Sequence, residues 1–251
     1  MQKAIVILKK ELKTIVISPI FLVILSTVAF IWSYVFVRSV IEFEQSIHTE
    51  SILGSGDLQT IINSFLSINY IIFIFLTPII AMKLLVEDKN NGSFNLLLFT
   101  PNSTWSIVLG KYLAGLCAIL IFLLVSLAYP LGVGQSVGFD QSLTLTAYLG
   151  MFFLSLTFFS VNSLICSFVR SSFLAIILSV IANIGLLMVG DMSLMPSNNF
   201  FSELVMQVSV ARHFSLLSQG AVAISSLVFF LSINFLCIYL MEKVVSLSRW
   251  K

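Results

Sequence analysis

Several asparagines lie within long stretches of the chain that contain no charged side chain, among them Asn69, Asn162, Asn183 and Asn234. The last three are candidates for lining a path across the membrane. In lipid, an amide group hydrogen-bonds between helices or lines a polar path across the membrane, because hydrocarbon offers it no partner. Both interpretations stay open. Asn162 and Asn183 are the better candidates for lining a path, since they lie well inside their apolar stretches.

Few residue patterns typical of enzymes occur in the sequence. His48 and His213 fall outside the apolar stretches, and neither HExxH nor a pair of acids within such a stretch occurs. The pattern GxSxG occurs at 134–138, but it presents a nucleophile only at a strand-to-helix turn, and the sequence indicates helices alone. The nucleotide-binding pattern GxxxxGK[ST] is also missing, because Gly110-Lys111 is followed by Tyr112 and has no glycine five residues earlier. The sequence therefore predicts no catalytic centre and no directly bound cofactor, so that any ATP hydrolysis is expected from a separate subunit.

The composition is that of a membrane protein. The chain is 59% hydrophobic and 10% charged, against roughly 45–50% and about 25% in ordinary soluble domains. A net charge of +2 from dispersed residues indicates no nucleic-acid surface, so membrane lipid is the expected surroundings. The cysteines show no spacing typical of a zinc site or a disulfide framework, and no metal is expected: Cys117, Cys166 and Cys237.

Six apolar runs are long enough to cross a bilayer as helices, which takes about 20 residues each. The charge-free stretch over 90–110 is rich in Asn, Ser, Thr, Gly and Pro and is expected to be a loop. The predicted fold is an all-α, polytopic membrane protein that forms one domain over 1–251. Its spans are expected at about 16–37, 61–82, 107–130, 144–167, 172–190 and 221–242.

The basic residues predict the orientation of the spans. With six spans, every Lys and Arg except Arg38 and Arg212 falls on the same side as the N-terminus. Because Lys and Arg concentrate in cytoplasmic loops, both termini are expected in the cytoplasm and the chain in the cell membrane. On the other side, residues 191–220 form a semi-apolar segment that is expected to lie at the outer interface.

Residues 1–15 have the pattern of an amphipathic helix along the membrane surface. On a helix, one face is apolar and the other carries lysines, including Lys9, Lys10 and Lys13. The apolar face is expected to comprise Ile5, Leu8, Leu12 and Ile15. Ser18-Pro19 then predicts a break before the first span. The alternative is that these residues are simply the positively charged flank of the first span.

The segment after the second predicted span resembles the corresponding segment of ABC-2 type transporter permeases. Those proteins show an acidic cluster, Gly-Thr, a Leu-Leu pair, a proline and then Gly-Lys at the third span. The matching residues are Glu87, Gly92, Leu96, Leu97, Pro101, Gly110 and Lys111, with Ser93 in place of Thr and Asn95 where Glu is frequent. Lys9 to Lys13 with Ser18-Pro19, and His213-Phe214 with Gly220, are similar to permeases related to the gliding-motility exporter.

The resemblance implies a function and a set of partners. It implies a permease that forms the substrate pathway as a homo- or heterodimer, is driven by separate cytoplasmic ATPase subunits that use ATP–Mg, and exports its cargo. Residues 1–15 would be the elbow helix, with Lys9, Lys10, Leu12 and Lys13. The loop over 86–105 would couple to the ATPase through Glu87, Asp88, Gly92, Ser93, Leu96, Leu97 and Pro101.

Two alternatives to these implications stay open. The apolar residues of the loop over 86–105 could rest on the membrane interface instead of meeting a partner. The chain could also be an ATPase-independent channel or secondary transporter, or else a membrane-embedded structural or assembly factor. Secondary transporters usually keep ionisable groups at mid-depth, where the predicted spans have only neutral polar ones, and this weakens that alternative.

Overall fold

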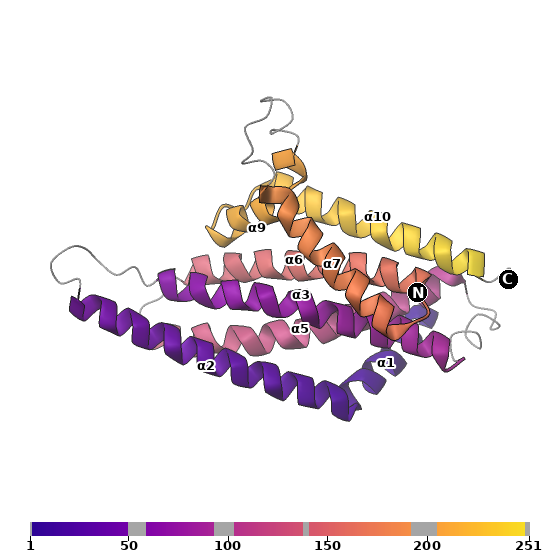
Figure 1. Ribbon diagram of the computed structural model, residues 1–251, viewed down its shortest axis with the longest axis horizontal. Helices are drawn as coiled ribbons and strands as arrows, with labels where there is room; N and C mark the ends of the chain where they lie inside the picture. The colour runs from indigo at the N-terminus through magenta and orange to yellow at the C-terminus, as the bar shows by residue number, and fades with distance from the viewer. Residues whose placement is uncertain (1, 50–58, 93–102, 138–140, 192–204, 249–251) are drawn as a thin grey trace.

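The computed structural model describes residues 2–49, 59–92, 103–137, 141–191 and 205–248, and these residues contain α-helices and no strand (Figure 1). Six of the helices are long and apolar enough to cross a membrane. The predicted all-α fold with six membrane-spanning helices is therefore confirmed. The helices are α1 Gln2–Ile17, α2 Pro19–Thr49, α3 Gln59–Asn90, α5 Thr104–Val137, α6 Gln141–Phe168, α7 Ser172–Asp191, α9 Val210–Ser218 and α10 Ile224–Ser248.

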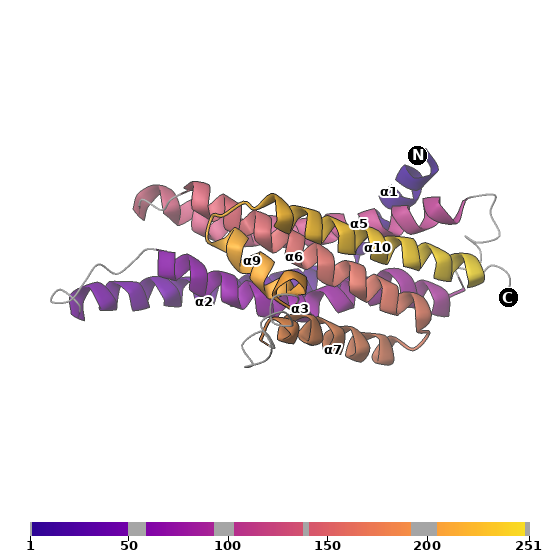
Figure 2. The same ribbon diagram turned by 90° about the horizontal axis from the view of Figure 1, so that it is seen from above.

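The six long helices form a bundle with a buried centre and an exposed periphery. In their apolar spans, α3, α5 and α6 bury more than half of their residues, whereas α2, α7 and α10 bury fewer than a third. Figures 1 and 2 show α2, α7 and α10 on the outside of the bundle and the chain termini at one end. The short helix α1 runs at a steep angle to the bundle at that end and packs mainly on α5.

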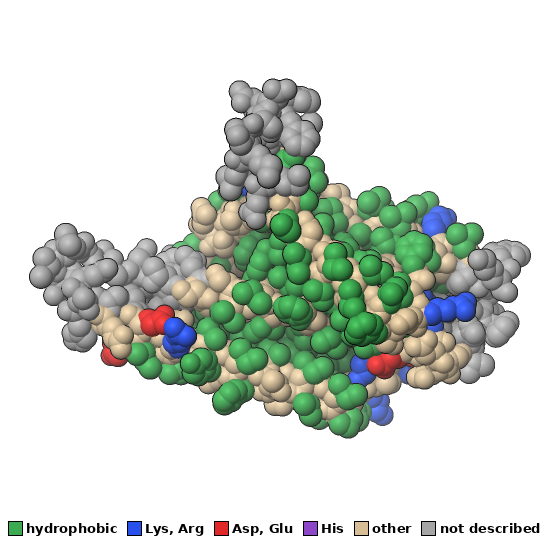
Figure 3. All heavy atoms as spheres, in the orientation of Figure 1, with side chains coloured by type: hydrophobic (Ala, Val, Ile, Leu, Met, Phe, Trp, Pro, Cys, Tyr) green, Lys and Arg blue, Asp and Glu red, His purple; other side chains and the backbone are tan. Residues whose placement is uncertain are grey.

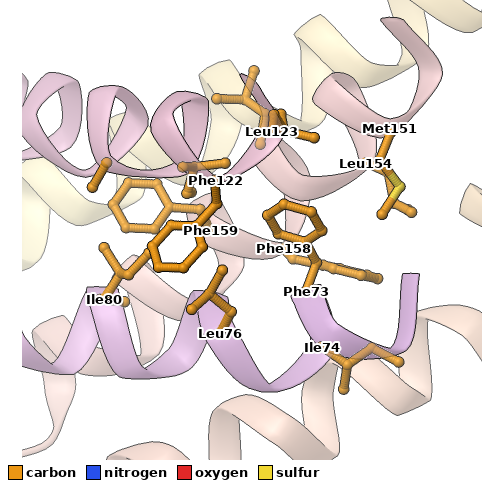
Figure 4. Packing of buried hydrophobic residues seen from close by; sticks show 14 of the residues in the cluster. Phe73, Ile74, Leu76, Ile80, Phe122, Leu123, Met151, Leu154, Phe158 and Phe159 are labelled. Carbon is orange, nitrogen blue, oxygen red and sulfur yellow. The ribbon is translucent and has the colours of Figure 1, made fainter. Parts of the chain in front are cut away.

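Aromatic rings fill the space between the central helices (Figure 4). Phe73 of α3, Phe122 of α5, and Phe158 and Phe159 of α6 are almost completely buried. The ring of Phe122 also meets Phe21 of α2 edge to face, with 5.3 Å between ring centroids. Large rings and branched side chains give the bundle its close packing, which in lipid must hold helices together without a hydrophobic driving force between them.

The outside of the bundle is apolar between two charged ends (Figure 3). Side chains such as Phe30 on α2, Phe173 on α7 and Phe235 on α10 are exposed. Exposed apolar surface on this scale is stable only where the surrounding solvent is lipid. The chain is therefore a multi-pass membrane protein.

Several helices extend further than the hydropathy pattern indicates. Helix α3 reaches Asn90, so the first residues of the loop expected over 86–105 are helical. Helix α2 continues beyond residue 37 to Thr49, supported where it leaves the apolar region by an ion pair between Arg38 Nε and Glu42 Oε1 at 2.7 Å. Helix α5 begins at Thr104, so residues 104–110 are helical rather than part of the expected loop. Ser103 explains this start, because its Oγ accepts a hydrogen bond from the N–H of Ser106 at 3.3 Å, as an N-cap does.

The described part of the segment over 191–220 contains a short helix that packs on the bundle. Ser209 caps α9, and Gly220 follows it with φ of 84°. A Cβ atom at Gly150 of α6 would lie 2.8 Å from Leu217 Cβ, so the glycine permits this close approach. The ring of His213 is buried, with Nδ1 2.9 Å from Ser226 Oγ and Nε2 3.0 Å from the Gln207 carbonyl.

Candidate functional site

Ionised side chains gather at the end of the bundle that carries both termini. We call this the charged end and define it by Glu11, Asp88, Lys89, Lys111 and Glu242. Glu11, Lys111 and Glu242 are buried. Lys111 and Glu242 belong to membrane-spanning helices, and Glu11 belongs to α1, which packs on one of them. A buried charge is costly unless it is paired, so the partners of these groups indicate what holds the end together.

Lys111 of α5 is the centre of the cluster, with only 1% of its side chain exposed. Its Nζ donates a hydrogen bond to the Leu84 carbonyl oxygen at 2.8 Å and lies 3.3 Å from Glu11 Oε1. It also forms an ion pair with Asp88 Oδ2. Because Glu11, Asp88 and Lys111 belong to α1, α3 and α5, one ammonium group ties three helices together.

A glycine next to Lys111 allows this contact. A Cβ atom at Gly110 would lie 2.8 Å from Ile7 Cβ and 3.0 Å from the Ala4 carbonyl oxygen, which is too close for any other residue. The backbone of α1 therefore lies directly on α5. Since residues four apart share a face of a helix, Ile7 brings Glu11 toward Lys111.

The buried face of α1 differs from the expected apolar face. It comprises Ile7, Glu11 and Ile15, whereas Ile5 is 50% exposed. The difference arises because α1 is positioned by its ion pair with α5 as well as by its apolar residues. Of the expected elbow-helix residues, Leu12 is half-buried and the lysines are exposed: Lys9, Lys10 and Lys13.

Lys89 links the end of α3 to the end of α6. Its Nζ donates hydrogen bonds to the carbonyl oxygens of Cys166 at 2.9 Å and Ser167 at 2.6 Å. These carbonyls belong to the last turn of α6, where a helix lacks intrahelical donors and carries partial negative charge. The next residue, Asn90, donates to Ser172 Oγ at the start of α7 over 3.5 Å. The end of α3 thus holds α6 and α7 as well.

A third contact joins α5 to α10. Thr104 Oγ1 donates a hydrogen bond to Glu242 Oε1 at 2.7 Å, at the first residue of α5. Residues 93–102 are flanked by α3, which is tied to α5, α6 and α7, and by α5, which is tied to α1, α3 and α10.

The structure brings some of the expected coupling residues to the charged end. Asp88 joins the Lys111 cluster, and Glu87 is half-buried on the same last turn of α3. Gly92 ends this helix with φ of 72°, a left-handed conformation that favours glycine, and its N–H donates to the Lys89 carbonyl at 3.3 Å. The other expected coupling residues lie outside the described residues: Ser93, Leu96, Leu97 and Pro101.

The three asparagines expected to line a path are all buried and fall into two groups. Asn162 and Asn183 meet at Thr77 of α3: Asn162 Nδ2 lies 2.9 Å from Thr77 Oγ1 and Asn183 Nδ2 lies 3.5 Å from it. Asn183 Nδ2 also donates to the Ile74 carbonyl at 3.0 Å. The side-chain oxygens of Asn162 and Asn183 are buried without a hydrogen-bond partner.

Asn234 lies apart from the other two asparagines. Its Nδ2 donates to the Phe230 carbonyl at 2.7 Å, and its Oδ1 accepts a short hydrogen bond from Ser160 Oγ on α6. These contacts join α10 to α6.

Sequence reasoning overlooked Glu11. It lies among lysines in a segment whose pattern indicates a surface helix, so its side chain is expected on the solvent-exposed face. The available signal was the spacing of Ile7, Glu11 and Ile15, which places the acid on an otherwise apolar face. Within the described ranges, no cluster of three His, Cys, Asp or Glu side chains has the arrangement of a metal site.

Comparison with known proteins identifies the family. The family described as ABC-2 family transporter protein matches residues 5–250, which is nearly the whole chain. A comparison with curated proteins gives no match. The family match agrees with six membrane-spanning helices, a charged end and the Glu87 to Lys111 pattern. The chain therefore belongs to the ABC-2 family of transporter proteins and is the membrane permease of an ABC transporter.

Proposed function

We propose that this permease exports its cargo as a dimer, driven by separate ATPase subunits that hydrolyse ATP–Mg and dock at the charged end. In this proposal the charged end faces the cytoplasm of a cell and the chain lies in its cell membrane. The distribution of Lys and Arg supports this orientation, since all except Arg38 and Arg212 belong to the same side as the termini.

The observation that carries the proposal is the set of ties around residues 93–102. A partner that displaces this segment would act on the ends of α3 and α5. Lys111 would transmit the displacement to α1, and Lys89 would transmit it to α6. Because packed helices move as rigid units rather than bending locally, one docking event would move most of the bundle.

The surface that would meet the ATPase is formed by α1 and the end of α3. The exposed lysines Lys9, Lys10 and Lys13 give α1 a positively charged outer face. Glu87 is half-buried and forms no ion pair with any residue that the structure describes. Both features suit a polar interface with a soluble subunit or with anionic lipid headgroups.

The proposed pathway is lined by Asn162, Asn183 and Asn234. Two of these side chains keep an oxygen without a partner while buried, which costs about 1–3 kcal/mol each in a closed bundle. Such groups gain partners when the helices separate and a polar cargo or water enters. Helix α7 carries Asn183 and buries few of its residues, so it is the helix whose displacement would open the path along these asparagines.

Glu87→Ala combined with Gly92→Val is expected to uncouple the ATPase from the permease. Valine at φ of 72° is strained by about 1–2 kcal/mol, which shifts the end of α3 out of its present position. We expect ATP hydrolysis by the reconstituted complex to lose its stimulation by the permease about tenfold. Permease-stimulated ATP turnover in lipid vesicles measures this.

A matched control changes the opposite end of the bundle. Arg38→Gln with Glu42→Gln removes an exposed ion pair worth at most about 1 kcal/mol and is expected to leave ATP turnover unchanged. Unchanged stimulation in the Glu87→Ala, Gly92→Val protein, or an equal loss in the control, would contradict the assignment of the coupling site.

A further inference from the structure

A small apolar pocket opens beside the turn between α1 and α2. It is lined by apolar side chains of α1, α2, α3 and α5, among them Ile15, Ile20, Ile24 and Ile79. The empty volume, its open side included, is about 330 Å³, so the pocket is a partly open groove rather than an enclosed cavity. A groove of this shape can take a flexible chain along its length.

The pocket opens toward lipid. Ile20 lines it and is 62% exposed, and Val23 on the next turn of α2 is 63% exposed. An apolar surface of this kind on a membrane-spanning helix faces hydrocarbon, so the chains of membrane lipids are what reaches the pocket.

One polar side chain lines the pocket, and it is a cation. Lys83 of α3 lies one turn before Glu87, close to the charged end, and its Nζ donates a hydrogen bond of 2.5 Å to Ser18 Oγ. In the described part of the chain, no carboxylate forms an ion pair with Lys83, because Glu11 and Asp88 are both paired with Lys111. Lys83 is therefore a half-buried ammonium group whose protein partner is neutral.

The surroundings of Lys83 add further donors for an anion. The hydroxyl of Ser18 accepts from Lys83 and keeps its own hydrogen for another acceptor. Helix α2 begins at Pro19, and its first intrahelical hydrogen bond runs from the Leu22 N–H to the Ser18 carbonyl. The N–H groups of the first turn of α2 are thus without an intrahelical acceptor, and a helix start of this kind favours negative charge.

From these contacts we infer that the pocket binds one anionic phospholipid from the membrane leaflet at the charged end. The phosphate accepts hydrogen bonds from Lys83 and Ser18 at the turn, and one acyl chain lies along Ile20, Ile24 and Ile79. The lipid holds the α1–α2 turn against α3. This site is separate from the coupling site, and it stands whether or not an ATPase drives the permease.

Thermal unfolding of the purified full chain in mild detergent tests the inference. Phosphatidylglycerol is expected to raise the unfolding temperature in a saturable way, more than phosphatidylcholine with the same acyl chains. Soluble glycerol phosphate at the same concentration is expected to have no effect, because it lacks the chain that fills the pocket. Lys83→Gln is expected to raise the half-saturating concentration of phosphatidylglycerol about tenfold, since a charge-assisted hydrogen bond is lost.

Two further variants keep the test decisive. Arg212→Gln removes an exposed basic side chain of α9, away from the charged end, and should respond as the unmodified chain does. Ile79→Trp fills the pocket while leaving Lys83 in place, and it should lose the response even if Lys83→Gln fails to fold. Equal effects of both lipids, an effect of glycerol phosphate alone, or a full response in Ile79→Trp would each overturn the inference.

Discussion

Replacing Lys111 by methionine is expected to destabilise the folded chain by about 3–5 kcal/mol, the cost of removing one partner of a buried ion pair. The methionine fills a similar volume, so the loss comes from Glu11 and Asp88, whose carboxylates would face each other without a cation. Helix α1 should detach from α5 first, since Glu11 is its only ionised contact with α5 among the described residues. Denaturant or thermal unfolding in detergent measures the loss.

Two controls separate charge from packing in the Lys111 experiment. Lys13→Met changes an exposed lysine of α1 and should alter stability by no more than about 0.5 kcal/mol. Neutralising both acids in the Lys111→Met background, as Glu11→Gln with Asp88→Asn, should recover part of the stability. A Lys111→Met protein as stable as the original would show that the cluster does not hold α1 in place.

Gly115→Ala should disrupt the centre of the bundle. A Cβ atom at this position would lie 2.1 Å from Phe159 Cζ and 2.9 Å from Leu84 Cδ1. Phe159 is 1% exposed and packed among other rings, so it cannot swing aside cheaply. We expect a loss of about 1–3 kcal/mol in unfolding free energy, the usual cost of overpacking a core. Thermal unfolding of the purified chain measures it.

Helix α5 contains its own control for this change. A Cβ atom at Gly132 would have nothing within 4 Å, so Gly132→Ala should be neutral or slightly stabilising. Phe159→Leu in the Gly115→Ala background should recover stability by making room for the new methyl group. Equal unfolding free energies for Gly115→Ala and Gly132→Ala would contradict the close contact of Gly115 on α5 with Phe159 on α6.

Hydropathy predicts the six spans because the bilayer acts on each helix separately. A run of apolar residues such as 172–190 must be helical in hydrocarbon whatever it packs against, and α7 covers Ser172–Asp191. The ends of helices are harder to predict, because beyond the hydrocarbon both helix and loop are stable in water. The ion pair of Arg38 with Glu42 and the cap at Ser103 decide these ends locally.

The candidate site was predictable only in part. The resemblance to ABC-2 permeases pointed to Asp88 and Lys111, and the structure brings them together. Periodicity could not assign Glu11 as the third member, since Glu11 and Lys111 are 100 positions apart in the sequence and meet only in the folded chain. Likewise, the pairing of Asn162 with Thr77 follows from helix packing rather than from the spacing of either residue.

The most direct test of an ATP-driven permease is to purify the tagged chain from its own membrane in mild detergent and identify what accompanies it. We predict a stoichiometric ATP-binding-cassette subunit and ATP hydrolysis by the complex, both retained in the Arg38→Gln, Glu42→Gln control. Recovery of the chain alone, without ATP hydrolysis and under conditions that preserve other transporter complexes, would contradict the proposal and favour an ATPase-independent channel or secondary transporter.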